Sequence, residues 1–151
     1  MQFFFFFTTT INPAKLYELH ETDVRCGYQS CPVIDPEKLN VHLIAHSYNS
    51  LGWTSTAETL FYKNVQYIIS SVVDALQVDP NRKFIQVETA YFHKWWELQN
   101  DYVKNSVKQL IDEGRLVITN GGWSMNDEAT SHYQSIIDQF TLGHRYLPKF
   151  N

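Results

Sequence analysis

The sequence predicts an α/β fold, in the form of a partial parallel sheet built from three β-α units. Short apolar segments with the two-residue alternation of strands occur three times along the chain. A segment with apolar residues at helical spacing follows each of them. Because strands that are joined through helices run parallel with right-handed crossovers, this order of elements predicts a parallel sheet.

Residues 1–39 are expected to form an irregular lead-in. They contain Pro13, Pro32 and Pro36. The run Phe3–Phe7 is apolar but is preceded by no basic residue, and it is shorter than the apolar core of a secretory signal. It is either a remnant of a signal segment or the product of a wrongly assigned start. Asp35-Pro36 predicts a turn before the first strand.

The first unit begins with a strand at Asn40–His46. Val41, Leu43 and Ala45 alternate with the other residues, which indicates a buried strand. A helix is expected at Lys63–Leu76, where the apolar residues recur every three or four positions. This apolar stripe consists of Val65, Ile68, Ile69, Val72, Ala75 and Leu76.

The second and third units repeat this pattern. A strand at Lys83–Glu88 precedes a helix at Asp101–Glu113, and Gly114 is the expected C-cap of that helix. A strand at Arg115–Thr119 then precedes a helix at Thr130–Leu147. The expected core residues of this last helix are Tyr133, Ile136, Ile137, Phe140 and Leu147.

Three parallel strands make a small sheet with an open edge. Parallel sheets are normally covered on both faces, and an open edge exposes unpaired backbone groups. We therefore expect residues 40–151 to be the N-terminal part of a larger domain that is incomplete at its C-terminus. The alternative is a complete three-layer miniature domain.

Composition excludes some classes of partner. The net charge is −4, and the 12 basic residues are scattered along the chain, so neither nucleic acid nor a membrane surface is an expected partner. Cys26 and Cys31 are separated by four residues, which does not match a zinc knuckle or a redox pair. They either bridge each other or pair elsewhere. His42 and His46 would lie about 13 Å apart on one strand, too far to share a metal ion.

Ligands of parallel sheets meet the loops that follow the strands, which here begin at His46, Glu88 and Asn120. The second loop is expected to run through Thr89–Trp96. Each loop contains tryptophan, and a rim of tryptophans suits the apolar faces of sugars, although packing is the alternative for Trp95 and Trp96. The carboxylates at this rim are Glu88, Asp127 and Glu128. Glu88 is expected to bind backbone amides or a nearby arginine, and the other two to lie at a helix N-terminus.

At these loops the sequence resembles the alpha-mannosidases of glycoside hydrolase family 38, from about Cys26 to Leu147. The Cys-Gly-Tyr-Gln-Ser-Cys-Pro segment is similar to the lysosomal branch of that family. The stretches that carry the resemblance are Leu39–His46, Gly52-Trp53, Val65–Ile68, Phe84–Glu88, Trp95-Trp96, Asn120–Trp123 and Met125–Ala129.

The resemblance implies the start of a seven-stranded α/β barrel-like glycosidase domain and a zinc-dependent, retaining hydrolase that trims terminal alpha-mannose from N-linked oligosaccharides. The family's zinc ligands in the first loop are a histidine and an aspartate. Tyr48 and Ser50 stand at the matching positions. A phenol and an alcohol are poor zinc ligands, so no zinc is expected here. The remaining ligands, the nucleophile and the acid/base would lie beyond Asn151, so we expect no catalytic residue in this chain.

Three hypotheses follow for function. The first is a truncated and inactive copy of a lysosomal alpha-mannosidase, and the second is a non-catalytic protein that binds mannose or a partner. The third is a piece of a longer, active enzyme with an unusual metal site. The expected substrate-binding residues are Trp53, Trp123 and Asp127, of which Trp53 matches the family's aromatic beside the sugar. A mannose-containing oligosaccharide and the remainder of the mannosidase fold are the expected partners. By the same resemblance the protein is expected to be lysosomal or secreted.

Overall fold

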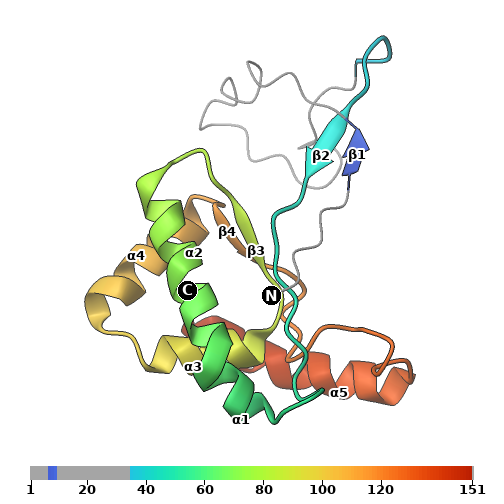
Figure 1. Ribbon diagram of the computed structural model, residues 1–151, viewed down its shortest axis with the longest axis vertical. Coiled ribbons are helices and arrows are strands. Elements are labelled where there is room, and N and C mark those ends of the chain that lie inside the picture. The colour runs from blue at the N-terminus through green and yellow to red at the C-terminus, as the bar shows by residue number, and fades with distance from the viewer. Residues whose placement is uncertain (1–6, 10–34, 151) are drawn as a thin grey trace. The chain divides into compact units, whose positions relative to one another are not determined.

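The computed structural model describes residues 7–9 and 35–150. The chain forms two compact units that divide after Ile44, so residues 7–9 and 35–44 belong to the smaller unit and residues 45–150 to the larger (Figure 1). None of the helices in these ranges has the length and apolar character that crossing a membrane requires. Cys26, Cys31 and the Phe3–Phe6 part of the phenylalanine run lie outside the described residues.

The smaller unit contains a two-stranded antiparallel sheet. Strand β1 (Phe7–Thr9) pairs with β2 (Val41–Leu43), with Phe7 opposite Leu43. The strand predicted at Asn40–His46 is therefore shorter than expected, and its neighbour runs antiparallel. Leu43 is 74% exposed, so the prediction of a buried strand is wrong. Alternation indicates a strand but does not identify the segment that pairs with it.

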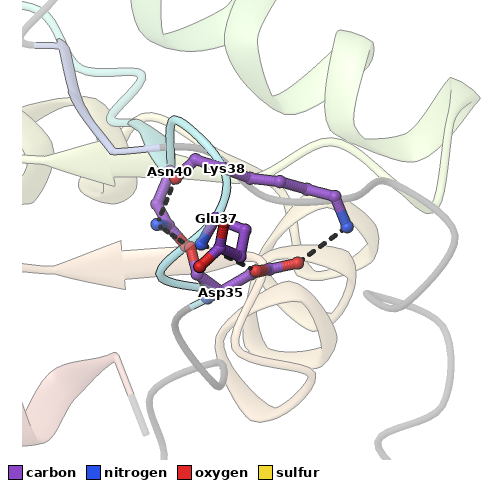
Figure 2. A network of polar contacts seen from close by, with 4 residues as sticks. All are labelled: Asp35, Glu37, Lys38 and Asn40. Atoms are coloured by element: carbon purple, nitrogen blue, oxygen red, sulfur yellow. Dashed lines mark hydrogen bonds and ion pairs between the residues drawn. The ribbon is translucent and has the colours of Figure 1, made fainter.

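The turn predicted at Asp35-Pro36 is confirmed. The Asp35 carboxylate accepts the Glu37 amide at 3.1 Å and pairs with the Lys38 ammonium at 2.7 Å (Figure 2). The Asn40 side chain accepts the Asp35 amide at 3.0 Å and donates to the Asp35 carbonyl at 2.8 Å. These bonds satisfy the backbone of the turn, and strand β2 begins at the next residue.

The larger unit contains a parallel pair, β3 (Phe84–Gln86) and β4 (Leu116–Ile118), with Phe84 opposite Leu116. Both strands were predicted. The predicted range extends one residue beyond each end of β4, and one residue before and two residues after β3. On the other side of β3, His46 forms an isolated parallel bridge with Ile85. The fold is therefore a mixture of helices and strands compatible with the α/β class, but two strands and one bridge replace the three predicted strands.

The first helical segment is longer than predicted. It starts with α1 (Ala57–Leu60), passes through a π-helical turn η3 (Phe61–Val65) and continues as α2 (Gln66–Val78). Thr56 caps its start by accepting the Thr59 amide at 3.2 Å. The buried face is close to the predicted stripe, with Val73 in place of Val72 as a fully buried residue.

Helix α3 (Thr89–Glu97) occupies the segment that was expected to be the second loop. That prediction is wrong. Six of the nine residues of the helix are buried, and among them Tyr91, Phe92, Trp95 and Trp96 recur at helical spacing. Trp95 and Trp96 are 2% and 5% exposed and pack against Phe92. They are core residues, which confirms packing, the alternative to sugar binding, for these two tryptophans.

Two further helices complete the larger unit. Helix α4 (Asp101–Asp112) is capped by Asn100, and Gly114 follows it with a φ of 64°, as expected of a C-cap glycine. Helix α5 (Tyr133–His144) precedes a short 3-10 turn η4 (Leu147–Lys149). Helix α5 is shorter than predicted, and two of its expected core residues, Tyr133 and Ile137, are 65% and 57% exposed.

One hydrophobic core holds the larger unit together. Helix α2 packs against α3, and α4 packs against β4 (Figure 1). The most buried aromatic side chains are Phe61, Tyr91, Phe92, Trp95 and Phe150. This core fixes α3 at the carboxyl end of β3, where the candidate site lies.

Candidate functional site

The segment after β4 and the start of α3 are bonded to each other. The Thr89 amide donates to the Gly122 carbonyl at 3.0 Å, and the Ala90 amide donates to the Trp123 carbonyl at 3.1 Å. These are amides of the first turn of a helix, which have no partner inside the helix. We call residues 119–128 the third rim segment, and this pair of bonds fixes it to α3.

Helix α5 supports the third rim segment from a second direction through Gln139, whose side chain is 9% exposed. The Trp123 amide donates to the Gln139 carbonyl at 3.0 Å, and the Ser124 amide donates to the Gln139 side-chain oxygen at 3.1 Å. The Gln139 side-chain nitrogen in turn donates to Asn126 at 2.6 Å. Sequence reasoning missed Gln139, since a glutamine on a helix carries no signal of burial.

Residues 47–53, the first rim segment, are held by side chains from the start of α3. The Asn49 amide donates to Glu88 Oε1 at 2.7 Å, and the Tyr91 hydroxyl donates to the Ser50 carbonyl at 2.8 Å. The expectation that Glu88 binds a backbone amide is confirmed. Tyr91 was missed, because the segment that contains it was expected to be a loop rather than the first turn of a helix.

Glu88 is 0% exposed, and its second carboxylate oxygen has no protein partner. Burial raises the pKa of Glu88 to about 7, and the bond from the Asn49 amide opposes this rise without cancelling it. The folded protein therefore holds Glu88 largely protonated below about pH 7, whereas an unfolded chain ionises it near the ordinary value of 4.5.

This pKa difference predicts a pH dependence of stability. Between pH 5 and pH 7 the unfolded chain has released the Glu88 proton and the folded chain largely retains it, so the free energy of unfolding falls as pH rises. The expected loss is about 2 kcal/mol. Urea denaturation at the two pH values measures it, and Glu88→Gln, which cannot ionise, should show a correspondingly smaller loss. An equal loss in both proteins would contradict the assignment to Glu88.

Two hydroxyl groups and one carboxylate meet between the first and third rim segments. The Tyr48 hydroxyl lies 2.6 Å from the Ser50 hydroxyl and donates to the Asp127 carboxylate. Partial burial, and then the bond to Asp127, raise the pKa of Tyr48, while the same bond lowers the pKa of Asp127. At neutral pH the cluster is therefore a neutral phenol bonded to a carboxylate.

The three predicted sugar-binding residues lie in different surroundings. Asp127 belongs to the cluster with Tyr48, and because α5 begins only at Tyr133, the expectation that Asp127 and Glu128 lie at a helix N-terminus is wrong. Trp123 is half-buried, with its ring 5.0 Å from that of Tyr146. Trp53 is 79% exposed.

The donor groups of the cluster do not suit a zinc ion. Zinc prefers thiolate, imidazole and carboxylate ligands, and here Asp127 is the one carboxylate beside two alcohols. Tyr48 would have to lose its proton to become a good ligand, and its raised pKa opposes that loss. Within residues 7–9 and 35–150, no three side chains of His, Cys, Asp or Glu lie close enough together to hold one metal ion.

A small cavity of about 110 Å³ lies beside the third rim segment. Ligand pockets that enclose a drug-sized molecule are typically about 300 Å³ or larger. This cavity is therefore too small to enclose such a ligand. The cavity is lined by Val87, Thr119, Asn120, Gly122, Ser124, Met125, Asn126 and Phe140.

Comparison with known proteins gives a consistent result. Residues 38–150 match the model of the glycosyl hydrolases family 38 N-terminal domain. The chain is 48% identical over 129 residues to a lysosomal alpha-mannosidase of Homo sapiens and 47% identical over 129 residues to that of Felis catus. It is also 44% identical over 128 residues to an alpha-mannosidase of Arabidopsis thaliana.

These similarities cover most of this chain and a small part of each relative. Each alignment spans 80% of the chain and 13% of the relative. The chain therefore spans roughly an eighth of the length of the curated relatives it matches.

Proposed function

The chain belongs to glycosyl hydrolase family 38, through the N-terminal domain of that family, and from this membership we propose that it is a mannosidase-type chain that has lost zinc-dependent hydrolysis. The relatives that it matches at 44–48% identity are named alpha-mannosidases, which supports terminal alpha-mannose as the sugar that the rim would bind. The substitutions Tyr48 and Ser50 in the first rim segment support the loss of hydrolysis.

The observation that carries the proposal is the bond between Tyr48 and Asp127. Tyr48 and Ser50 stand where the resemblance places a zinc-binding histidine and aspartate. Their hydroxyl groups bond to each other, and that of Tyr48 also donates to Asp127, so their polar atoms are already satisfied without a cation. A metal ion at this place would have to break these bonds and ionise a phenol whose pKa is raised.

We further propose that residues 40–151 are the N-terminal part of the seven-stranded α/β domain, after a lead-in at residues 1–39. Within the described residues, β4 pairs with β3 alone. A groove of about 270 Å³ runs along β4, lined by Ile111, Leu116, Val117, Ile118 and Leu147. An apolar groove beside an unpaired strand edge is suited to a further strand of the same fold.

A turnover assay tests the loss of hydrolysis. The natural protein, incubated with zinc and a chromogenic alpha-mannoside, is expected to release no chromophore above the rate of the zinc-containing buffer. The double variant Tyr48→His with Ser50→Asp, made in the same protein, restores the ligand pair but supplies no nucleophile or acid/base, so it is expected to gain affinity for zinc without releasing chromophore. Zinc-dependent release by the unaltered protein would overturn the proposal.

A second candidate function is binding of mannose without hydrolysis, and the exposure of Trp53 favours it. A tryptophan ring that is 79% exposed leaves its face free to stack on a pyranose. Trp123 and Asp127 would complete the contact from the third rim segment. The ligand would be a mannose-containing oligosaccharide, and kinship with lysosomal enzymes suggests a lysosomal or secreted protein.

Replacing Trp53 separates these two candidates. If the rim binds mannosides, Trp53→Ala is expected to weaken the affinity roughly fivefold, because a stacked ring contributes about 1 kcal/mol. Trp53→Phe keeps an aromatic face and should retain most of the affinity. Isothermal titration with a mannobiose measures both variants. An absence of heat with the unaltered protein would exclude the binding function.

A further inference from the structure

We propose that Glu88 and Tyr91 are positioning residues that clamp the backbone of the first rim segment and thereby set where Tyr48 and Ser50 face Asp127. The part of this proposal that concerns sugar binding rests on the proposed function. The positioning itself is a statement about hydrogen bonds and does not depend on any ligand.

The clamp consists of two bonds to adjacent residues of the first rim segment. Glu88 Oε1 accepts the Asn49 amide at 2.7 Å, and the Tyr91 hydroxyl donates to the Ser50 carbonyl at 2.8 Å. One bond therefore fixes a backbone donor and the other a backbone acceptor. Both bonds lie between Tyr48 and the residue after Ser50, so they orient the two side chains of the hydroxyl cluster.

The two clamping side chains come from one rigid place. Glu88 is the residue before α3, and Tyr91 lies in the first turn of that helix, which follows directly from β3 (Figure 1). They are 0% and 2% exposed. The Tyr91 ring stacks on Phe61, with the ring centroids 6.4 Å apart and the planes 12° from parallel. Packing of this kind limits the rotamers that each side chain can adopt.

The same turn of α3 also holds the third rim segment. The amides of Thr89 and Ala90 donate to the carbonyls of Gly122 and Trp123, while the side chains of Glu88 and Tyr91 hold the first rim segment. Four consecutive residues thus bond to both segments. The bond from Tyr48 to Asp127 then joins the two segments at a separate point.

Burial of the Glu88 carboxyl group lowers the stability of the fold. A fully buried carboxyl group with one unpartnered oxygen destabilises a fold more than an apolar side chain of similar size would. Its other oxygen accepts the backbone amide of Asn49 and so fixes the first rim segment to the core. If this position served packing alone, an apolar side chain would be sufficient, and the carboxyl group of Glu88 would not be needed.

Amide hydrogen exchange of the full chain tests the clamp. Tyr91→Phe removes one hydroxyl and leaves the ring that stacks on Phe61, and Glu88→Ala removes the acceptor of the Asn49 amide. Both are expected to speed exchange at Asn49 roughly tenfold and to leave the amides of β3 and α2 unchanged. Glu88→Gln retains an oxygen acceptor and should restore slow exchange.

A second measurement reports on the hydroxyl cluster. Loosening the clamp should move the pKa of Tyr48 back toward 10, as followed by the ring carbon resonance during titration, since Tyr48 would be less buried and its bond to Asp127 would weaken. Glu88→Ala risks unfolding, but Tyr91→Phe alone decides the proposal. Unchanged exchange at Asn49 and an unchanged pKa of Tyr48 in folded Tyr91→Phe would overturn it.

Measuring mannobiose binding to the unaltered protein and to Tyr91→Phe distinguishes a failure of the clamp from a failure of the proposed function. If mannobiose binds the unaltered protein, Tyr91→Phe is expected to lower the affinity several-fold at unchanged global stability. If no mannobiose binds while Asn49 exchange responds as expected, the binding function fails and the clamp stands.

Discussion

Replacing Gly143 by alanine is expected to lower the free energy of unfolding by about 3 kcal/mol, which is the upper end of the range for overpacking a rigid site. A Cβ atom at Gly143 would overlap the Gly121 carbonyl oxygen and lie 2.6 Å from the Trp123 amide nitrogen. Both are backbone atoms of the third rim segment, which cannot rotate away as a side chain can. Urea denaturation of the full chain measures the loss.

The direction of this effect distinguishes close packing from helix propensity. Gly143 lies inside α5, where alanine would normally stabilise by about 1 kcal/mol. Ser135→Ala is the matched control, since Ser135 is exposed on the same helix, and its effect should stay within about 0.5 kcal/mol. If Gly143→Ala were as stable as the parent, the third rim segment would not lie against α5 as described.

Trp95→Ala is expected to lower the free energy of unfolding by about 4 kcal/mol. The indole is 2% exposed, its ring centroid lies 5.8 Å from that of Phe92, and its nitrogen donates to the Ser70 hydroxyl at 2.9 Å. The substitution removes a large apolar surface and leaves a cavity between α2 and α3. Thermal and urea denaturation both measure this loss.

Trp95→Phe serves as the control for Trp95→Ala. It keeps most of the apolar surface and loses the bond to Ser70, so about half of the destabilisation is expected. A contrary result is also well defined. If Trp95→Ala retained full stability and abolished mannoside binding, Trp95 would be a rim residue and the packing of α3 would be wrong.

Much of the larger unit could be predicted from local patterns. The helices at Gln66–Val78 and Asp101–Asp112 each place apolar residues on one face and polar residues on the other, and the sequence shows that period directly. The strands at Phe84–Gln86 and Leu116–Ile118 are short apolar runs bounded by turn residues. Local periodicity was sufficient wherever an element has one buried and one exposed face.

The failures occurred where the tertiary arrangement decides what a local pattern becomes. In α3 the buried residues Tyr91, Phe92, Trp95 and Trp96 recur at helical spacing, but the segment comes soon after a strand, where a loop was expected. At Val41–Leu43 the alternation was read correctly as a strand, but its antiparallel partner is the distant segment Phe7–Thr9. At Tyr133 and Ile137 the helical spacing is present, yet both residues are exposed.

The candidate site was predicted in part. The sequence singled out Tyr48 and Ser50 through the resemblance and Asp127 as a rim carboxylate. It could not predict that the Tyr48 hydroxyl bonds to Asp127, because these residues are 79 positions apart and only the folded chain brings them together. Glu88 was predicted to bind a backbone amide, but the identity of that amide depends on the path of the first rim segment.

The most direct test of the central claim is a zinc titration of the metal-stripped protein in the presence of a competing chelator. The hydroxyl groups of Tyr48 and Ser50 are already bonded within the cluster, so the chelator is expected to keep the zinc, and Tyr48→Phe should behave in the same way. The claim would be contradicted by a one-to-one zinc complex of the unaltered protein that survives the chelator and that Tyr48→Phe or Ser50→Ala abolishes.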